Sequence, residues 1–505
     1  MWTLDGDGPL YQQVYRAARK AILSAELPPG VRFPSTRTLA RDLGVSRNTV
    51  ILAYDQLLSE GYVATREGSG TFVATHLPED MTEAIRSDRA DPAPADIFTP
   101  RLSAYGQRLV ASGPRTVTWE APSSPLRFDF RYGRPNFFDF PHDTWCRVLA
   151  NRARRASIRQ LDYGPPAGRD ELRNAIAEYL WRSRGVVCTP EQVIVVNGSQ
   201  QALDLAARVL VDPGDHVVIE EPHYPGARLA FEAAGAEIVP GPLDDDGLQL
   251  ATVTDERPIR LAYVTPAHQF PSGVSMPIQR RLEVLAWAEQ RDALIFEDDY
   301  DSEFRYSGRP VEALQGLDRA GRVIYGGTFS KLMFPALRLG YLVLPAALVA
   351  PVTAAKAISD TGCPALEQLA LADFIQQGHF ERHLRRSRTR NAKRREVLLS
   401  ALARHCGDRV EVTGVNAGLH VLVWLNGIST RRIPALRRRA AEQGVGIYPV
   451  APFYRDPPAR GGLLLGFASL QEKEIEEGIQ RLARVLDTRE ETPARAVTSS
   501  SPLRK

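Results

Sequence analysis

The chain has 505 residues, of which 44% are hydrophobic and 24% charged, a composition typical of a soluble globular protein with about three domains. Its formal net charge of +3 excludes a dominant basic tail or a long acidic chain, although local asymmetry can hide in that average. The four cysteines lie far apart without a C-x-x-C pair, which excludes a zinc ribbon and favours reduced thiols in the cytoplasm. We expect neither a secretory signal nor a membrane span, because the first residues lack a basic segment and no apolar stretch is long enough.

Residues 1–76 predict three helices followed by two short strands. Ser35 begins a helix with Leu39 and Leu43 on one apolar face, and Gly44 makes the turn to a helix that Ser46 caps. The apolar stripe expected on that capped helix consists of Val50, Tyr54, Leu57 and Leu58. Its first turn is polar and basic, which suits docking in the major groove of DNA. The spacing alone also permits a helical bundle with a solvated arginine face.

This part of the chain resembles the winged helix-turn-helix of GntR-type bacterial regulators over residues 9–76. The shared features are LPPGVRFPSTRTLARDLGVSRNTVILAYDQLLSEGYV and a glycine-rich wing at residues 67–70. The resemblance implies that the segment binds double-stranded DNA, where an arginine can hold a phosphate or read a guanine edge. The DNA contacts that it implies are Arg37, Ser46, Arg47, Asn48, Thr49 and, at the tip of the wing, Gly68.

The remaining sequence divides into a linker, a long regular region and a tail. Residues 77–100 are acidic and rich in proline, which predicts a flexible linker, and residues 488–505 predict a disordered tail. Residues 101–487 alternate β-branched runs with helical patterns, which indicates an α/β domain with a mostly parallel sheet covered on both faces. The expected strands include residues 193–196, 216–221, 236–239, 260–264, 293–298, 322–326 and 337–344.

Lys331 is one of only six lysines, and it lies in GGTFSKLMFPALRLG directly after a buried strand pattern. Schiff-base chemistry with a carbonyl cofactor needs a lysine that is partly desolvated and held by a rigid element. The alternative from this segment alone is a lysine that closes a salt bridge near a loop. Ligands of such sheets bind at the carboxyl ends of the strands, so Lys331 stands where chemistry is expected.

Three residues elsewhere offer contacts to the ring of a cofactor. Asp298 and Tyr300 follow the preceding strand in EDDYDSEF, where a carboxylate can keep a pyridine nitrogen protonated and a phenol can bond the ring O3′. Tyr224, in EPHYPG, is an aromatic residue placed to stack on the ring. Together with Lys331, these residues favour a pyridine cofactor over a salt bridge.

A second group of residues offers contacts to a phosphate. Ser199 and Gln200 open a helix in NGSQQALDL, and the free N–H groups at a helix N-terminus can bind a phosphate. Arg338, seven residues after Lys331, can clamp the same phosphate with a bidentate fork. The sequence therefore predicts a phosphorylated cofactor.

The order of these residues resembles that of fold-type I aminotransferases, which use pyridoxal 5′-phosphate (PLP), over residues 125–487. The resemblance implies a mostly parallel sheet with a smaller α+β subdomain, and a Schiff base between Lys331 and PLP. It assigns the pyridinium pair to Asp298, the O3′ bond to Tyr300, the ring stack to Tyr224, and the phosphate to Arg338, Ser199, Gln200 and Thr328. Tyr163, in LDYGPPAG, matches a tyrosine that reaches the phosphate from the partner subunit, which implies a homodimer.

The two modules joined by an acidic linker resemble the MocR-type transcription regulators over nearly the whole chain. The resemblance implies that PLP, or its adduct with a small-molecule amine, changes how two DNA-binding heads are presented. The rival interpretation is a working aminotransferase with an appended DNA-binding domain. We expect no metal site.

Two segments depart from the aminotransferase pattern. Enzymes of this fold carry an arginine in the C-terminal strand that binds the substrate α-carboxylate, and Leu464 stands in its place, with Arg455 or Arg460 as alternatives. Loss of that charge-assisted pair costs about 1.5–3 kcal/mol, which favours a ligand other than an α-amino acid, or a sensor of PLP itself as in the PdxR-like branch. The loop TPAHQFPSG, residues 265–273, also departs from the Asn-Pro-x-Gly pattern of the enzymes and is similar to that of the regulators.

A basic run, HLRRSRTRNAKRR at residues 383–395, has two interpretations. It is either a second DNA contact, because clustered arginines attract phosphates, or a long helix with a solvated basic face.

Overall fold

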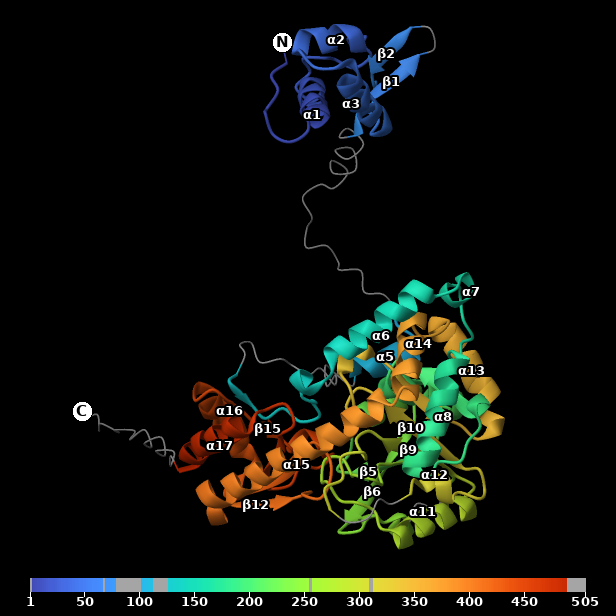
Figure 1. Cartoon of the computed structure of the whole chain (residues 1–505), viewed down its shortest axis with the longest axis vertical. Coiled ribbons are helices and arrows are strands. Elements are labelled where there is room, and N and C mark those ends of the chain that lie inside the picture. The colour runs from blue at the N-terminus through green and yellow to red at the C-terminus, as the bar shows by residue number, and fades with distance from the viewer. Residues whose placement is uncertain are drawn as a thin grey trace, which may run out of the picture. The chain divides into compact units, whose positions relative to one another are not determined.

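The chain divides into two compact units, Met1–Arg101 and Leu102–Lys505, each with its own helices and strands (Figure 1). The structure is a computed structural model that describes residues 2–66, 69–78, 101–111, 126–253, 257–307 and 312–487. The expected wing tip Gly68, residues 79–100 of the expected linker and the expected tail lie outside the described residues.

The N-terminal unit contains a three-helix bundle and a hairpin. Its elements are α1 (Leu10–Leu23), α2 (Thr36–Leu43), α3 (Arg47–Ser59), β1 (Val63–Arg66) and β2 (Gly70–Val73). Ser35 and Ser46 cap α2 and α3, because each hydroxyl accepts a hydrogen bond of 3.1 Å from a backbone N–H group of the first turn. The expected stripe on α3 is wrong at Leu58, which is 42% exposed, whereas Ala53 is buried. Helical spacing from Val50 brings positions three, four and seven residues later to one face, and Leu58 lies beside it.

A sheet of eight strands forms the centre of the second unit. Its order is β4 (Val193–Val196), β11 (Gly340–Val343), β10 (Val323–Thr328), β9 (Leu294–Asp299), β8 (Ile259–Val264), β5 (His216–Glu221), β6 (Glu237–Asp244) and β7 (Gly247–Leu248). The strands from β10 to β6 are parallel to one another, and β11 and β7 are antiparallel to their neighbours. The expectation of a mostly parallel sheet is thus confirmed.

The expected strand at residues 337–344 is shorter than predicted. Pro335–Leu337 form a 3-10 turn, and Arg338 has the positive φ of +51°, which interrupts an extended backbone before β11 begins at Gly340. β6, in contrast, continues beyond the expected residue 239 to Asp244.

Helices cover both faces of the large sheet. Ile194 and Val196 of β4 pack in the cluster that contains α9 (Ser199–Leu210), α10 (Pro225–Ala234) and α13 (Ala346–Asp360). Val193 and Val195 belong to the cluster of the opposite face, because successive side chains of a strand point in opposite directions. The other helices of the large domain are α5 (Ala104–Ala111), α6 (His142–Arg155), α7 (Ile158–Leu161), α8 (Asp170–Arg184), α11 (Ile278–Gln290), α12 (Leu314–Leu317) and α14 (Ala365–Gln376).

A smaller α+β subdomain follows, with a four-stranded sheet in the order β12 (Val410–Thr413), β13 (His420–Ser429), β16 (Arg460–Gly466) and β15 (Tyr448–Pro449). Two short strands, β3 (Phe128–Asp129) and β14 (Val445–Gly446), pair in parallel beside it. Its helices are α15 (His379–His405), α16 (Ile433–Glu442) and α17 (Glu472–Asp487). The basic run lies within α15, where Arg394 is buried and pairs with Asp139 at 2.6 Å. In the part of the chain that the structure describes, no helix is long and apolar enough to cross a membrane.

Candidate functional site

The predicted DNA-binding residues other than Gly68 lie on α2, on α3 and in the turn between them. Arg37, Arg47 and Asn48 are exposed. The Ser46 hydroxyl accepts a hydrogen bond from the backbone of Thr49 and lies 2.8 Å from its hydroxyl, so these two side chains serve at least the helix cap. The guanidinium of Arg47 reaches back to the hydroxyl of Thr36 at 3.4 Å, which leaves most of its donors facing solvent.

A cleft of about 2270 Å³ in the second unit contains nearly all of the predicted cofactor-binding residues. Tyr224, Asp298, Thr328 and Lys331 reach it from the carboxyl ends of β5, β9 and β10 or from the loops that follow them. The cleft therefore lies at the edge of the sheet where α/β proteins bind ligands.

Lys331 lies in the loop after β10, and its Nζ donates a hydrogen bond of 2.8 Å to the carbonyl of Gly133. Burial lowers the pKa of Lys331 to about 8, although the charges of Asp301 and Asp298 oppose the shift. Near pH 8 the Lys331 amine is therefore neutral in a large fraction of the molecules, and the neutral amine is the nucleophilic form.

Asp298 is 4% exposed at the end of β9. Its Oδ2 accepts a hydrogen bond of 2.7 Å from the Tyr263 hydroxyl, whereas its Oδ1 is buried without a hydrogen-bond partner among the described residues. Burial raises the pKa of Asp298 to about 7, and the Tyr263 hydroxyl counteracts this rise. An N–H donor that also carries positive charge would satisfy Oδ1 and restore the ionised carboxylate.

A cradle for an anion lies where α9 begins. Gly198 precedes the helix with a φ of +89°, and a Cβ atom built there would lie 3.0 Å from the guanidinium of Arg338. Arg338 donates a hydrogen bond of 2.5 Å to the carbonyl of Asn197, which directs it to the same loop. Ser199 also lines the cleft, and its backbone opens the helix. A helix N-terminus and a guanidinium that converge in this way suit a phosphate.

Two other residues predicted to contact the phosphate, Gln200 and Thr328, already make hydrogen bonds within the protein. The side chain of Gln200 donates a hydrogen bond of 3.0 Å to the carbonyl of Gly226, which leaves its backbone N–H for a ligand. The Thr328 hydroxyl accepts a hydrogen bond of 3.2 Å from the backbone of Ser330. Ser330 lines the cleft as well and was not predicted, although its place directly before Lys331 could have indicated it.

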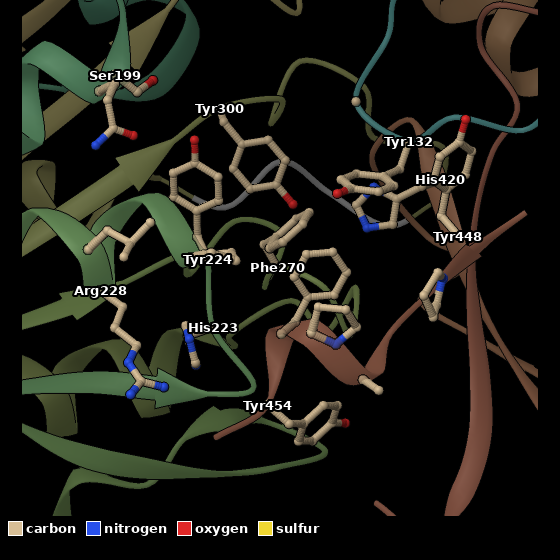
Figure 2. A pocket seen from close by; sticks show the side chains of 18 of the residues that line it. Tyr132, Ser199, His223, Tyr224, Arg228, Phe270, Tyr300, His420, Tyr448 and Tyr454 are labelled. Atoms are coloured by element: carbon tan, nitrogen blue, oxygen red, sulfur yellow. The ribbon is translucent and has the colours of Figure 1, made fainter. Parts of the chain in front are cut away.

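Aromatic side chains surround the middle of the cleft (Figure 2). The rings of Tyr224 and Tyr300 each meet Phe270 edge to face, with centroids 5.8 and 6.1 Å apart. The Tyr300 hydroxyl lies 3.0 Å from Nδ1 of His268, which contacts Asp301 at 3.1 Å. His268 and its partner are therefore positioned to orient the Tyr300 hydroxyl, a feature that the sequence motifs did not indicate.

Leu464 lies where a carboxylate-binding arginine was expected, and it is fully buried. It packs in one apolar cluster with Phe270, Leu422, Val450 and Phe453, against which Tyr224 and Tyr300 also lie. Of the two alternative arginines, Arg460 pairs with Glu411 at 2.7 Å and lies over the ring of Trp424, outside the residues that line the cleft. Arg455 does line the cleft and is exposed.

Tyr163 is the predicted cofactor-binding residue that the structure does not bring to Lys331 of the same chain. It is 89% exposed on the loop after α7. It lines a separate, smaller cavity together with Asp360, Thr361 and Cys363. Within one chain, Tyr163 and Lys331 therefore line different cavities.

The residues of the cleft fit PLP. Asp298 presents a buried acceptor for the pyridinium nitrogen, the Gly198 loop and Arg338 leave a cradle for the phosphate, and Lys331 presents an amine of lowered pKa. When bound, PLP supplies an aldehyde and a ring that withdraws electrons. No metal site was expected, yet among the described residues the ligand atoms of His268, Asp301 and His420 lie within 4.8 Å of one another, close enough to hold an ion.

Each of the two units is similar to a known protein family. Residues 136–482 match aminotransferase class I and II, and residues 10–73 match the bacterial regulatory proteins of the gntR family. The chain is 44% identical over 481 residues to the probable rhizopine catabolism regulatory protein MocR of Rhizobium meliloti, which covers 95% of this chain and 94% of that protein. It is 31% identical to the pyridoxine biosynthesis transcriptional regulator PdxR of Corynebacterium glutamicum, over 92% of each chain.

Among solved structures, the multiple substrate aminotransferase of Thermococcus profundus is similar with a TM-score of 0.69 and 30% identity. The match covers 76% of this chain and 97% of the enzyme, so the second unit has the fold of PLP-dependent aminotransferases. The full-length relatives are regulators that add the N-terminal head. The chain belongs to the MocR-type transcription regulators, with a GntR-type DNA-binding head and a PLP-dependent aminotransferase-like domain.

Proposed function

We propose that this regulator works as a cytoplasmic homodimer that senses PLP, or an amine joined to PLP, in its cleft and changes its binding to an operator in response. The observation that carries the proposal is the buried Oδ1 of Asp298, which has no partner among the described residues, in a chain that also bears a helix-turn-helix. A buried acceptor without a partner is costly, so the cleft is built for a bound group. Because the same chain carries a DNA-binding head, we infer that the bound group regulates DNA binding.

The cofactor-binding roles rest on the geometry of the cleft. Asp298 pairs with the pyridinium nitrogen, and Tyr300 and Tyr224 contact the ring oxygen and the ring face. Lys331 holds the cofactor covalently through its amine. Arg338, Ser199, Gln200 and Thr328 bind the phosphate, with the N-terminus of α9 supplying backbone N–H groups.

The dimer is supported by the surface around Tyr163. Ile158 is 86%, Leu161 63% and Tyr163 89% exposed on α7 and the loop that follows, and Ile358 near the end of α13 is 86% exposed. Four large apolar or aromatic side chains on neighbouring segments are unusual for a free surface. We propose that a second copy covers them and that Tyr163 of one protomer reaches the phosphate in its partner.

DNA recognition is assigned to the exposed start of α3 and to Arg37. Arg47 and Asn48 reach base edges, Arg37 holds a backbone phosphate, and Ser46 and Thr49 orient the first turn. Gly68 belongs to the same proposed interface.

The decisive experiment measures binding of the purified full-length chain to DNA upstream of its own gene, with and without PLP and primary amines. We expect operator affinity to change at least fivefold when the cofactor or its amine is present. Equal affinity under all conditions would refute the sensor function. Many rapid turnovers of an amino donor to a keto acid would support the aminotransferase interpretation instead.

A further inference from the structure

A second of the six lysines, Lys356, is fully buried, although it is not among the residues that line the cofactor cleft. It lies on α13, and its Nζ donates hydrogen bonds of 2.8 Å to both carboxylate oxygens of Asp360, the last residue of that helix. The helix dipole disfavours a carboxylate at a helix C-terminus, and a buried ammonium is costly unless it is paired. Other contacts must therefore offset the cost of placing this ion pair here.

Three further donors converge on the carboxylate of Asp360. Its Oδ2 accepts hydrogen bonds of 2.7 Å from Nδ2 of Asn197 and of 2.6 Å from Nε2 of Gln201. Its Oδ1 accepts a hydrogen bond of 3.0 Å from the backbone N–H of Gly362. Both oxygens therefore accept from N–H donors. An amide of the same shape accepts at one end only, so the arrangement requires a carboxylate.

Asn197 connects these contacts to the cradle proposed for the phosphate, because it directly precedes Gly198. Its side chain donates to Asp360, and its backbone N–H donates a hydrogen bond of 2.7 Å to Oε1 of Gln201. Its carbonyl accepts the hydrogen bond of 2.5 Å from Arg338. Asn197 is thus held at three points, and it links the loop at Gly198 to the guanidinium on the other side of the cradle. Backbone N–H groups bind a phosphate well when such contacts fix their direction in advance.

We propose that Asp360 is a positioning residue for the phosphate of PLP: it orients Asn197 and Gln201, and through them the loop at Gly198. The proposal rests on the proposed function, since it concerns the same cofactor. Asp360 is not among the residues that line the cleft, so it acts through the residues that it holds. Lys356 balances the charge of the carboxylate from within the same helix.

A comparison of PLP with pyridoxal isolates the contribution of the phosphate. Pyridoxal has the same ring and aldehyde but no phosphate, so both compounds can react with Lys331 and contact Asp298. Their dissociation constants are measured on the full-length chain by visible absorbance and calorimetry, and thermal unfolding of the unloaded chain checks folding. We expect the unaltered chain to bind PLP at least roughly 100-fold more tightly than pyridoxal, because the phosphate accepts several charge-assisted hydrogen bonds.

Two substitutions should reduce this preference selectively. Asp360→Asn turns an N–H₂ group toward other N–H donors whichever way the amide is rotated, so it should weaken PLP binding by at least about tenfold and change pyridoxal binding by less than about twofold. Gln201→Leu removes the side chain that bonds both Asp360 and Asn197, and it should have the same selective effect. The two substitutions together should weaken PLP binding little more than either alone, because they act through the same contacts.

Asp487→Asn is the matched control. Asp487 also ends a helix, α17, and pairs with an arginine, Arg409, but it does not line the cleft. The control should change neither dissociation constant by more than about twofold. If Asp360→Asn does not fold because Lys356 is left unpaired, Lys356→Met in the same chain removes that charge, and we expect the same selective loss of PLP binding.

Several outcomes would overturn the proposal. Equal weakening of PLP and pyridoxal in a folded Asp360→Asn chain would show that Asp360 supports the whole domain and not the phosphate. Unchanged binding of PLP to that chain would show that the loop at Gly198 keeps its geometry without the carboxylate. If PLP does not load on the unaltered chain, the proposed function fails as well. If PLP loads and both variants keep the preference for it over pyridoxal, only the role of Asp360 fails.

Discussion

Replacing Asp298 with asparagine tests the central contact of the cofactor cleft. Asparagine keeps the shape of the side chain and an oxygen that can accept the 2.7 Å hydrogen bond from Tyr263. It loses the negative charge and presents an N–H₂ group, not an acceptor, to the ring nitrogen. The substitution therefore reverses the required direction of that hydrogen bond while it disturbs little of the surrounding core.

The size of the effect follows from the burial of Asp298, which is 4% exposed. A charge-assisted hydrogen bond at a buried site contributes about 1.5–3 kcal/mol. Its loss should raise the dissociation constant for PLP by about 10- to 150-fold. Burial also raises the pKa of this carboxyl to about 7, so the unaltered chain should bind PLP more weakly as the pH falls below 7. The asparagine variant should lose this part of the pH dependence.

The assay is a titration of the full-length chain with PLP, followed by visible absorbance, with thermal unfolding of the unloaded protein as a check on folding. Tyr263→Phe is the matched control, because it removes the hydroxyl from Oδ2 and leaves Oδ1 for the cofactor. We expect that control to weaken binding by less than about tenfold. An Asp298→Asn variant that folds and binds PLP within twofold of the unaltered chain would refute the assignment of Asp298.

Lys331→Ala should abolish the visible absorbance of covalently held PLP while the melting profile stays unchanged, and an unaltered spectrum would mean that another amine holds the cofactor. The rate of PLP uptake should rise with pH up to about 8 and level off above it, because the neutral amine of Lys331 is the reacting form and burial lowers its pKa to about 8. A rate that still rises steeply to about pH 10 in stopped-flow measurements would contradict this lowered pKa. Arg47→Ala should weaken operator binding by about tenfold in a gel-shift assay without changing PLP uptake, whereas loss of both would indicate misfolding. If Tyr163 of one protomer contacts the phosphate in its partner, Tyr163→Ala should weaken PLP binding. Mixed dimers that combine a Tyr163→Ala chain with a Lys331→Ala chain, titrated with PLP, test whether Tyr163 acts across the interface.

Much of the cofactor cleft could be predicted because its contacts lie at the ends of strands. The apolar runs before Asp298 and Lys331 have the length and composition of buried parallel strands. Residues that follow parallel strands meet at one edge of the sheet, so the order of the motifs along the chain predicted that Asp298 and Lys331 lie close together. The capped helices of the head were equally visible, since Ser35 and Ser46 each precede a helical apolar pattern. These features depend on local sequence, and the structure places them as local rules predict.

The features that sequence reasoning missed depend on contacts between distant segments. His420 begins a strand of ordinary apolar pattern, and only the packing of the small subdomain brings it within 5.0 Å of the His268 ring. Leu58 was misplaced because an apolar residue beside a helical stripe looks like part of it, and the rotation of α3 is set by its partners. The contact proposed for Tyr163 needs a second chain, which no pattern within one chain can supply.

The two departures from the enzyme pattern meet in space although nearly two hundred residues separate them. Phe270, from the loop after β8, and Leu464, on β16, belong to one apolar cluster together with Phe453. Each departure alone could be a neutral change of sequence. Side by side, they place hydrocarbon behind Phe270 and Phe453, which do line the cleft, at the position where the enzymes carry an arginine. The residues proposed to bind PLP still line the cleft, and the loss of the arginine at Leu464 supports the proposed sensing of an amine over the turnover of amino acids.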